Sequence, residues 1–497
     1  MSTTHVDVLV IGAGLSGVGM ACHIARQCSG LSYALVERRE RLGGTWDLFR
    51  YPGIRSDSDM FSFGYKFRPW HALKVLADGP SIRQYIGETA REYGVDDHIH
   101  YGLQTRSANW DSAARRWTVE SVNEATGETQ TFVCRVLLPC TGYYSYDQGY
   151  MPDFPGADQF KGELFHPQHW PEDLDYSGKR VVVIGSGATS VTLVPSMAGK
   201  AAHVTMLQRS PSYIFSVPGF DALSERLGKL LPDSLVYGMA RKRNIVVQRW
   251  MYKAAKRWPN ATRKLLLSGV KRQLGENADM SHFEPSYNPW DERLCAVPDG
   301  DLFAAIRKGD ASIVTDHIDH FTETGIKLKS GRELEADIII SATGLQLQML
   351  GGMDLSIDGE PQQASSRMTY KGVLLEDVPN FGYVFGYINA PWTLKADLAS
   401  EYMCRLLNHM DRKGYDVFMP HDDEGVKVED ESIMDELASG YVRRGAPNLP
   451  RQGRKLPWRV LHNFERDQRM LLKEPLEDGV LQFEAASADQ LNQAAAA

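Results

Sequence analysis

The sequence predicts an α/β protein built on two parallel sheets, with a helical insertion. Two segments, beginning at Asp7 and at Arg180, each combine a short apolar run, a glycine-rich turn and a helical pattern. That order is typical of the strand, phosphate loop and helix of a Rossmann-like dinucleotide-binding domain. A third segment, 220–280, has helical periodicity and few β-strand signals, so we expect helices there.

The composition is that of a soluble globular protein. A chain of 497 residues is long enough for two or three domains, and 43% of it is hydrophobic against 24% charged. No apolar run approaches the roughly 18 residues that a membrane-spanning helix needs. The N-terminus lacks the basic start and cleavage site of a signal peptide, so we expect a cytoplasmic location.

The cysteines and the net charge argue against a zinc protein, a dithiol redox enzyme and a nucleic-acid-binding protein. The six cysteines are scattered without a Cys-x-x-Cys pair, which argues against a zinc site and against a dithiol redox centre. A reduced cytosolic setting fits this usage. The net charge of −8 gives no general attraction to nucleic acid, so we expect no nucleic-acid partner.

The first glycine loop predicts a dinucleotide site. Gly12, Gly14 and Gly17 follow an apolar strand and open a helix, and Glu37 ends the next strand 20 residues after the last glycine. Such glycines let a pyrophosphate approach the backbone at a helix N-terminus, and the acid binds ribose hydroxyls. An ordinary βα turn is the alternative. We assign this loop to FAD.

The second glycine loop predicts a site for NADPH. Its run, Ile184-Gly185-Ser186-Gly187-Ala188-Thr189-Ser190, ends in serine where glycine is usual. The next strand ends in Gln208 and Arg209 and carries no acid there. An acid would repel a 2′-phosphate, whereas a guanidinium binds it with bidentate geometry, so NADP(H) is preferred over NAD(H). A solvated arginine at a strand end is the alternative for Arg209.

Two dinucleotides on one chain imply one tightly bound and one exchanging cofactor. Because a cysteine pair is missing, the options narrow to flavin oxidoreductases that pass electrons onward from the flavin. We expect oxygen to be the acceptor.

Two further motifs carry a family resemblance. The pattern F-x-G-x-x-x-H-x-x-x-W-P fits the run from Phe160 to Pro171, with His166 at its centre, and G-G-x-W-x-x-x-x-Y-P-G-x-x-x-D fits the run from Gly43 to Asp57. Both resemble signatures of type I Baeyer–Villiger monooxygenases. The run Arg50–Asp59 is similar to that of the ethionamide-activating monooxygenase subgroup. The resemblance extends from about Val6 to Glu465.

The resemblance implies FAD, NADPH and O2 as reagents. Ketones would be converted to esters or lactones through a flavin C4a-peroxide, and sulfur compounds would also be oxidised, so a small apolar ketone or sulfide is the expected substrate. The family's FAD contacts fall on Ser16, Glu37, Thr45, Trp46, Asp47, Leu48, Asp57 and Thr105. Its NADPH contacts fall on Arg55, Ser56 and Asp57, on the second glycine loop, and on Gln208 and Arg209.

The resemblance also places the family's transition-state stabilising arginine on Arg293. A positive group beside the flavin stabilises the anionic peroxide and the negative charge of its adduct. A buried arginine needs an anionic partner, and Asp57 is the candidate. A structural ion pair between domains is the alternative. Many family members have lysine before this arginine, and Glu292 stands here, which puts in doubt an extra cationic contact to NADP.

His166 reads as an interdomain linker residue, because it sits beside Pro167 and His169 in a run that precedes a strand. We expect it to couple domain rotation to cofactor position, rather than to act as a general base.

The function that follows is an FAD- and NADPH-dependent Baeyer–Villiger monooxygenase. A flavin monooxygenase acting mainly on sulfur or nitrogen is the second interpretation. A flavin-bound sensor or interaction protein that no longer turns over is the third.

The domains are expected to be discontinuous, because x-Thr-Gly turns at 140–142 and 342–344 mark crossings between them. The C-terminal tail is rich in alanine, serine and glutamine, so we expect it to be disordered. The expected boundaries are 1–142 and 345–484 for the FAD domain, 143–219 and 281–344 for the NADPH domain, 220–280 for the insertion, and 485–497 for the tail.

The segment from Arg226 to Arg272 is strongly basic. It holds thirteen Lys and Arg residues and one acid, Asp233, a local charge of +12. A solvated helical face is the favoured interpretation. A peripheral membrane contact that delivers apolar substrates, and steering of anionic NADPH, are less favoured alternatives.

Overall fold

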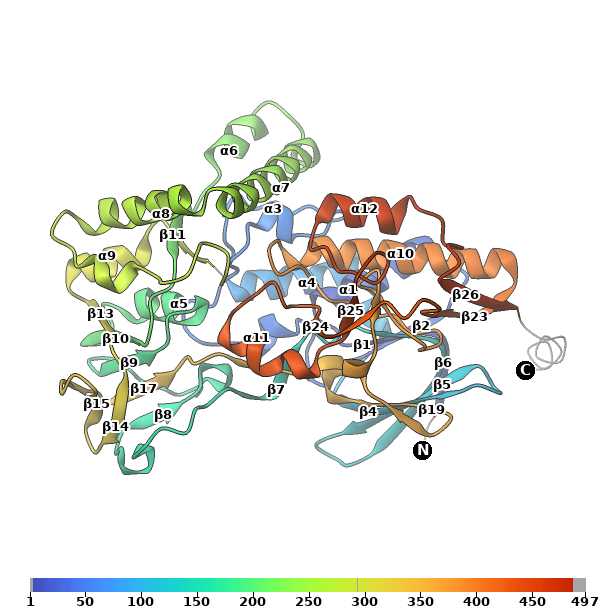
Figure 1. Cartoon of the computed structure of the whole chain (residues 1–497), viewed down its shortest axis with the longest axis horizontal. Coiled ribbons are helices and arrows are strands. Elements are labelled where there is room, and N and C mark those ends of the chain that lie inside the picture. Colours follow the sequence, from blue (N-terminus) through green and yellow to red (C-terminus); the bar gives the residue numbers. More distant parts are fainter. Residues whose placement is uncertain (1–2, 293, 486–497) are drawn as a thin grey trace.

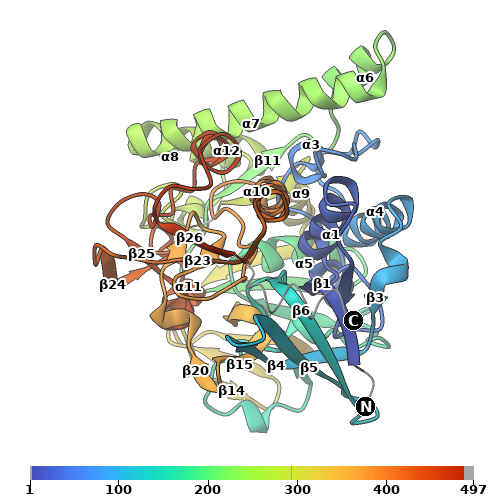
Figure 2. The same cartoon turned by 90° about the vertical axis from the view of Figure 1, so that its right-hand side faces the viewer.

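The structure is a computed structural model that describes residues 3–292 and 294–485. The chain folds around two main sheets that lie side by side, with helices packed against them (Figure 1). The N-terminal part of the chain and a later return form the first sheet, and the middle of the chain forms the second. A layer of helices runs along the upper side of the molecule (Figure 2).

The first sheet is built around the strand that precedes the first glycine loop. Its order is β20-β19-β4-β5-β6-β1-β2-β3, with β1 parallel to both β2 and β6. The apolar run of β1 is buried, which explains its near-continuous hydrophobic sequence. The bounds are β1 (Thr3–Ile11), β2 (Tyr33–Val36), β3 (Ile99–His100), β4 (Leu103–Asp111), β5 (Arg116–Asn123), β6 (Thr129–Pro139), β19 (Asp354–Ile357) and β20 (Glu360–Gln362).

β5 and β6 follow each other along the chain and pair antiparallel. β6 also pairs in parallel with β1, with Leu138 opposite Val10. The antiparallel pair β5–β6 is therefore part of the same sheet as β1. β19 extends the same sheet from far along the chain, pairing in parallel with β4.

The second sheet has the order β13-β10-β9-β17-β8, and the pairs along it are parallel. β9 precedes the second glycine loop, and its interior side chains are buried. A small antiparallel sheet, β14-β15-β16, lies beside it. The bounds are β8 (Glu163–Phe165), β9 (Arg180–Ile184), β10 (His203–Gln208), β13 (Ala311–Thr315), β14 (Ile318–Thr322), β15 (Gly325–Leu328), β16 (Glu333–Glu335) and β17 (Ile338–Ser341).

The chain crosses between the sheets at the two x-Thr-Gly turns. β7 (Tyr144–Gly149) follows the first turn and β18 (Leu345–Leu347) follows the second, and the two strands pair antiparallel with each other. His166 lies against both crossings. Its Nε2 lies 2.9 Å from the carbonyl oxygen of Gly344, and a Cβ on Gly149 would lie 2.0 Å from its ring.

The helical insertion reaches both sheets. Its long helix α7 packs on α3 beside the first sheet, whereas α8 packs on α9 and β11 beside the second. These helices form the outermost layer of the molecule in Figure 2. The bounds are α3 (Met60–Phe63), α6 (Ala222–Gly228), α7 (Asp233–Arg257), α8 (Pro259–Leu274), α9 (Asp301–Lys308) and β11 (Ile214–Val217).

The C-terminal part returns to the first sheet. α10 packs on α1, the helix of the first glycine loop, and α12 packs on α10. Ala485, the first residue of the predicted tail, ends β26, and residues 486–497 lie outside the described residues. The remaining bounds are α1 (Leu15–Gln27), α2 (Thr45–Leu48), α4 (Gly79–Glu92), α5 (Ala188–Met197), α10 (Trp392–Lys413), α11 (Gly440–Gly445), α12 (Phe464–Leu472), β12 (Cys295–Pro298), β21 (Thr369–Tyr370), β22 (Leu374–Leu375), β23 (Tyr415–Pro420), β24 (Lys427–Ser432), β25 (Arg451–Gly453) and β26 (Leu481–Ala485).

Within the described ranges, no helix combines the length and the apolar character that crossing a bilayer requires. The six cysteines are buried, and among the described residues none forms a disulfide bond. The same residues contain no group of three His, Cys, Asp or Glu side chains arranged to hold a metal ion.

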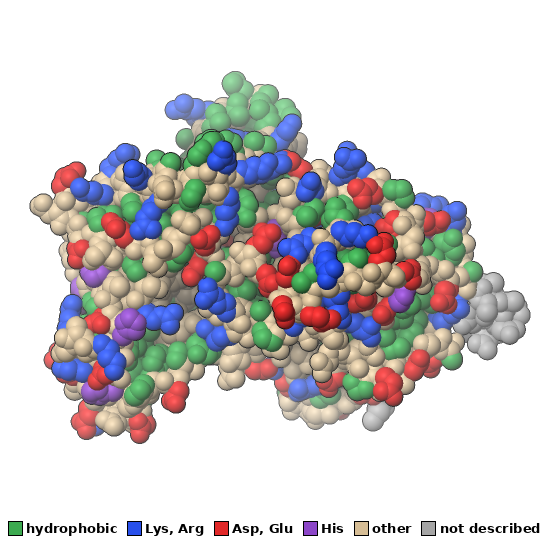
Figure 3. Space-filling model, in the orientation of Figure 1, with side chains coloured by type: hydrophobic (Ala, Val, Ile, Leu, Met, Phe, Trp, Pro, Cys, Tyr) green, Lys and Arg blue, Asp and Glu red, His purple; other side chains and the backbone are tan. Residues whose placement is uncertain are grey.

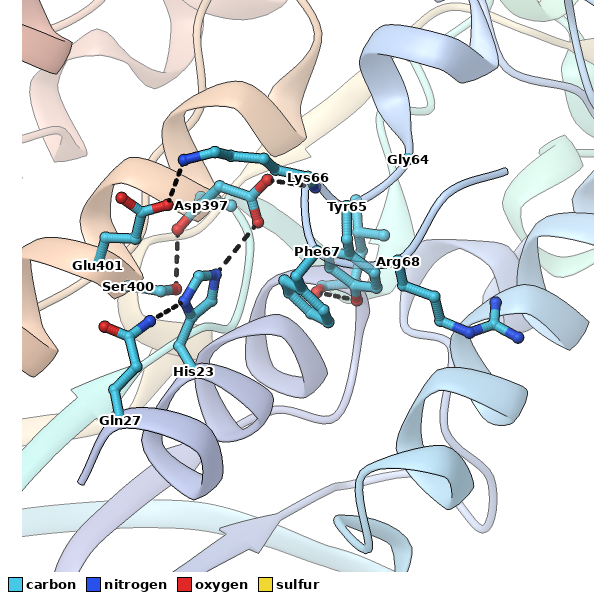
Figure 4. A network of polar contacts seen from close by, with 12 residues as sticks. His23, Gln27, Gly64, Tyr65, Lys66, Phe67, Arg68, Asp397, Ser400 and Glu401 are labelled. Carbon is cyan, nitrogen blue, oxygen red and sulfur yellow. Dashed lines mark hydrogen bonds and ion pairs between the residues drawn. The ribbon is translucent and has the colours of Figure 1, made fainter. Parts of the chain in front are cut away.

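The buried carboxylate of Asp397, on α10, contacts α1 and the segment that follows α3 (Figure 4). One oxygen of Asp397 accepts a hydrogen bond from the backbone N–H of Lys66 at 2.9 Å. The other oxygen lies 3.5 Å from Nε2 of His23 on α1. A guanidinium nitrogen of Arg241, on α7, also lies 3.5 Å from this carboxylate. The insertion is thus tied to the helix that carries the first glycine loop.

Replacing this carboxylate should destabilise the first domain. In Asp397→Ala the charge of Arg241 loses its buried partner, so we expect the free energy of unfolding to fall by about 3 kcal/mol. Chemical denaturation followed by intrinsic fluorescence measures this change. The exposed Asp354→Ala is the matched control, with an expected change within about 0.5 kcal/mol. Equal effects of the two substitutions would contradict the role given to Asp397.

Candidate functional site

Both glycine loops open into one cavity of about 900 Å³. The first loop follows the end of β1 and the second follows the end of β9, so the carboxyl ends of these two strands face the same space. Ligands of open α/β sheets bind at such strand ends. The crossing strands supply Tyr144, Tyr146 and Leu345 to the same lining.

The first loop is shaped so that the backbone can approach a ligand closely. Gly12 has φ +98°, and a Cβ there would lie 3.0 Å from the carbonyl oxygen of Cys140. A Cβ on Gly17 would lie 1.8 Å from the carbonyl oxygen of Gly12, so only glycine lets α1 begin this close to the loop. The N-terminus of α1 therefore opens on the cavity, a geometry suited to a pyrophosphate.

Glu37 stands at the end of β2 and lines the cavity. One carboxylate oxygen accepts the backbone N–H of Ala13 at 2.7 Å, and the other accepts that of Arg39 at 2.9 Å. Burial raises the pKa of Glu37, and these two N–H donors oppose that shift. The acid is thus held against the glycine loop, in the position where ribose hydroxyls are bound in dinucleotide domains.

The second loop leaves room beside its central glycine. A Cβ on Gly185, at φ +137°, would lie 2.4 Å from the carbonyl oxygen of Ala342, whereas nothing lies within 4 Å of a Cβ on Gly187. Gly187 lines the cavity, so the open space beside it fits a phosphate group. Ser190 does not line the cavity. It is buried beside Gly185, and its hydroxyl has no hydrogen-bond partner among the described residues.

The two residues at the end of β10 differ in whether they line the cavity. The exposed Arg209 lines the cavity. Gln208 does not, because its buried side-chain amide donates to the carbonyl oxygen of His282 at 2.7 Å and to the hydroxyl of Thr315 at 2.8 Å. Gln208 therefore supports the strand end from which Arg209 projects.

A second cationic residue, Arg444 on α11, lines the same cavity. Its guanidinium lies 3.6 Å from the centre of the Tyr150 ring. Burial lowers the pKa of Arg444, and the positive charge of Arg209 lowers it further. Neither arginine forms a salt bridge within the described part of the chain, which leaves both charges available to an anion. Sequence reasoning missed Arg444, and the only signal for it was the pair Arg443–Arg444 in a glycine-bounded segment.

The predicted run from Thr45 to Leu48 divides into two groups. Thr45 and Trp46 line the cavity. Asp47 is buried away from it, 2.8 Å from a guanidinium nitrogen of Arg39, and Leu48 packs in the core of the second domain. The acid and the leucine thus support the loop and do not face the cavity.

The cavity wall next to α3 includes Arg55, Ser56 and Asp57. The guanidinium of Arg55 lies 2.5 Å from a carboxylate oxygen of Asp301 on α9, a bridge between the two domains. Asp57 is exposed at the cavity. Thr105 also lines it, and its hydroxyl lies 3.1 Å from that of Ser121.

Arg293 lies outside the described residues. Its chain neighbours Glu292 and Leu294 both line the cavity. Burial raises the pKa of Glu292, whereas the positive charges of Arg443 and Arg209 oppose that shift. An acid therefore stands near the arginines at the position where many family members carry a lysine.

Aromatic side chains form another part of the wall. The indole N–H of Trp392 donates to the hydroxyl of Ser16 at 2.7 Å, and the indole stacks on Tyr143 with ring centres 5.2 Å apart. Both aromatic residues line the cavity. This contact joins the start of α10 to the first glycine loop, and it presents a flat apolar surface to a bound ligand.

His166 does not line the cavity. Burial lowers the pKa of its imidazole, so the ring is neutral at pH 7. The neutral ring accepts the N–H of Gln168 on Nδ1 at 3.1 Å, and its Nε2–H donates to Gly344 at the crossing. Its contacts are those of a residue that holds the crossing.

The cavity brings together most of the residues predicted for cofactor binding. Gly17, Asp47, Leu48, Ser190 and Gln208 lie outside its lining and support the loops. The predicted residues that line it are Gly12, Gly14, Ser16, Glu37, Thr45, Trp46, Arg55, Ser56, Asp57, Thr105, Ile184, Gly185, Ser186, Gly187, Ala188, Thr189 and Arg209.

Solved structures with the same fold include two monooxygenases. A steroid monooxygenase bound to NADP superposes with a TM-score of 0.77 at 22% identity, covering 97% of this chain and 100% of that one. Cyclohexanone monooxygenase from Rhodococcus sp. Phi1, bound to NADP+, gives 0.75 at 19% identity, covering 98% and 100%. Residues 10–86 match an NAD(P)-binding Rossmann-like domain. The predicted α/β fold class with two dinucleotide-binding domains is confirmed.

Sequence comparison gives closer relatives. MymA of Mycobacterium tuberculosis (strain ATCC 25618 / H37Rv), named as an FAD-containing monooxygenase, is 62% identical over 489 residues, 98% of this chain and 99% of the relative. The FAD-containing monooxygenase EthA of the same strain is 51% identical over 483 residues, 97% and 98%. Residues 74–357 match the flavin-binding monooxygenase-like family. The resemblance predicted from the motifs is confirmed, and the chain belongs to the flavin-binding monooxygenase-like family.

Proposed function

We propose that this chain is an FAD- and NADPH-dependent Baeyer–Villiger monooxygenase that converts ketones to esters or lactones and also oxidises sulfur compounds. The observation that carries the proposal is the single cavity shared by both glycine loops. Two dinucleotides held at those loops would meet in one enclosed space. A location in a reducing compartment, the cytoplasm, suits the buried cysteines, which form no disulfide bond among the described residues.

The first loop would hold FAD. Gly12 and Gly14 would receive its pyrophosphate at the N-terminus of α1, and the carboxylate of Glu37 would accept hydrogen bonds from its ribose. Trp46 and Trp392 supply apolar surface to the cavity. The relatives named as FAD-containing monooxygenases support this assignment. The chemistry that FAD supplies when bound is acceptance of a hydride from NADPH and transfer of an oxygen atom from O2.

The second loop would hold NADPH. The open space beside Gly187 suits the pyrophosphate, and Arg209 with Arg444 suits the 2′-phosphate. Because neither guanidinium has a carboxylate partner among the described residues, an anionic phosphate would satisfy both. Arg55, in the first domain, forms an ion pair with Asp301 in the second, and this bridge would hold the two cofactor sites in register.

Arg293 would provide the positive charge that stabilises negative charge developing on the substrate oxygen. Its neighbours Glu292 and Leu294 at the cavity support that position. A guanidinium stays protonated and donates several hydrogen bonds, so it stabilises an anion without giving up its proton. Asp57, also at the cavity, would orient the guanidinium.

Product analysis with a ketone and a sulfide in one preparation tests the proposed function. The wild-type protein should form ester or lactone from the ketone and sulfoxide from the sulfide, with NADPH consumed in step. Arg293→Ala should still oxidise NADPH but lose ester formation by at least about a hundredfold, because removing one preorganised donor typically costs that much. Arg293→Lys keeps the positive charge and should retain part of the ester-forming activity.

Gas chromatography quantifies the products, and absorbance at the NADPH band follows the cofactor. A normal ester yield from Arg293→Ala would remove Arg293 from the reaction. Sulfoxide without any ester from the wild-type protein would favour a flavin monooxygenase that acts on sulfur. Bound flavin with no NADPH consumption under any condition would favour a sensor.

Removing the cationic pair should change cofactor preference. In Arg209→Ala and in Arg444→Ala the KM for NADPH should rise about tenfold or more, since a charge-assisted hydrogen bond is lost, while the KM for NADH should change little. Steady-state kinetics with both cofactors measures the difference. Arg332→Ala, at an exposed arginine far along the second domain and outside the cavity lining, is the control. Equal changes for NADPH and NADH would show that the pair does not recognise the 2′-phosphate.

A further inference from the structure

The helical insertion carries an unusual concentration of exposed apolar side chains. Among the described residues, twelve large apolar side chains are exposed, and ten of them lie between 220 and 265. The most exposed are Leu230 at 83%, Leu265 at 71% and Trp250 at 67%. Figure 3 shows apolar side chains gathered on the projection at the top of the molecule, with basic side chains beside them. We call the exposed side of residues 220–274 the hairpin surface.

The apolar side chains of α7 follow one side of the helix. Leu235, Met239, Val246 and Trp250 are spaced by four, seven and four residues, which places them in one stripe. The other side of α7 faces the protein, where Tyr237 is buried. The favoured expectation of a solvated helical face is therefore incomplete, because the exposed side is apolar as well as basic.

The same surface is positively charged, and its charge is only partly balanced. Of the thirteen Lys and Arg residues between 226 and 272, six form ion pairs with carboxylates among the described residues. The other seven have no such partner in that part of the chain. Lys242, Lys253 and Lys264 belong to this group, and all three are exposed. An apolar stripe among unpaired cations matches the chemistry of an anionic lipid surface.

The opposite side of α7 is anchored firmly. A guanidinium nitrogen of Arg241 donates to the carbonyl oxygens of Phe61, Ser62 and Gly64 at 2.9, 3.2 and 2.6 Å. The side-chain amide of Asn244 donates to Asp59 at 2.7 Å. These hydrogen bonds fix the inner side of α7 to the protein, so the apolar side of the helix faces outward. None of residues 222–274 lines the cavity.

We propose that the hairpin surface docks the protein on the face of a bilayer that contains anionic lipids. Trp250 and Trp258 would lie at the headgroup level, where amphipathic indoles are favoured, and the unpaired lysines would contact lipid phosphates. A second copy of this chain is a poorer occupant, because two identical surfaces that each carry seven basic side chains without a carboxylate partner among the described residues would repel each other. The cavity would remain free while the protein is docked.

Vesicle co-sedimentation with the full-length, flavin-loaded protein tests this proposal. The protein should sediment with vesicles of equimolar phosphatidylglycerol and phosphatidylcholine at low salt, and much less with phosphatidylcholine alone or at high salt. The triple variant Lys242→Glu, Lys253→Glu, Lys264→Glu should bind at least about tenfold more weakly. The triple variant Leu230→Ser, Trp250→Ser, Leu265→Ser should also bind more weakly, even though its charge is unchanged.

The matched control is Lys179→Glu, Lys413→Glu, Lys473→Glu, which makes the same change of charge at exposed lysines elsewhere and should bind as the wild type does. The NADPH oxidation rate of every variant verifies that it is folded. Absence of co-sedimentation with anionic vesicles at low salt would overturn the proposal, as would equal binding by the control and the hairpin charge variant. An oligomer in size-exclusion chromatography that the serine variant dissociates, with no vesicle binding, would assign the surface to a second copy.

Discussion

The site depends on the way in which the chain crosses between its two sheets. Each sheet presents a glycine loop and a helix N-terminus at the carboxyl end of one of its parallel strands, and such a site alone would bind a single dinucleotide. β7 and β18 pair with each other at the crossing, so the two strand ends are held toward one cavity. His166 binds this crossing through Gly344 and packs against Gly149. His166 therefore contacts the segments that join the two sheets, and it lies outside the cavity lining.

The parts of the fold that local patterns encode were predictable. Buried parallel strands read as short apolar runs, and both glycine loops and Glu37 stand where such strands end. The second x-Thr-Gly turn predicted the return of the chain to the first domain, but the pairing of β19 with β4, about 250 residues earlier, was not predictable because it leaves no local period. The Asp397 network has the same origin, since its members are distant in sequence and meet only when the helices pack.

The candidate site shows the same division between local and long-range information. Motifs located the loop residues, but could not separate those that face the cavity from those that support it. Gln208 and Asp47 are among the predicted cofactor contacts, and each forms a buried structural bond. Arg444 reaches the cavity from a short helix near the C-terminus, where no motif marks it. Side-chain direction decides these cases, and it follows from tertiary packing.

The insertion belongs to both domains physically, although it interrupts only one of them in sequence. α7 is anchored to the loop after α3 and to Asp397, while α8 packs on α9 beside the second sheet. The arrangement ties the insertion to both domains at once. Its polar contacts face inward, and its apolar and unpaired basic side chains face outward.

One shared cavity would let electrons from NADPH reduce O2, so that one oxygen atom enters the substrate and the other leaves as water. Turnover of a ketone under oxygen-18 gas, with mass spectrometry of the product and parallel measurement of NADPH, tests it most directly. The account predicts one labelled oxygen atom in each ester or lactone and one NADPH consumed for each product molecule. NADPH consumption that yields labelled hydrogen peroxide, with the ketone recovered unchanged, would contradict it.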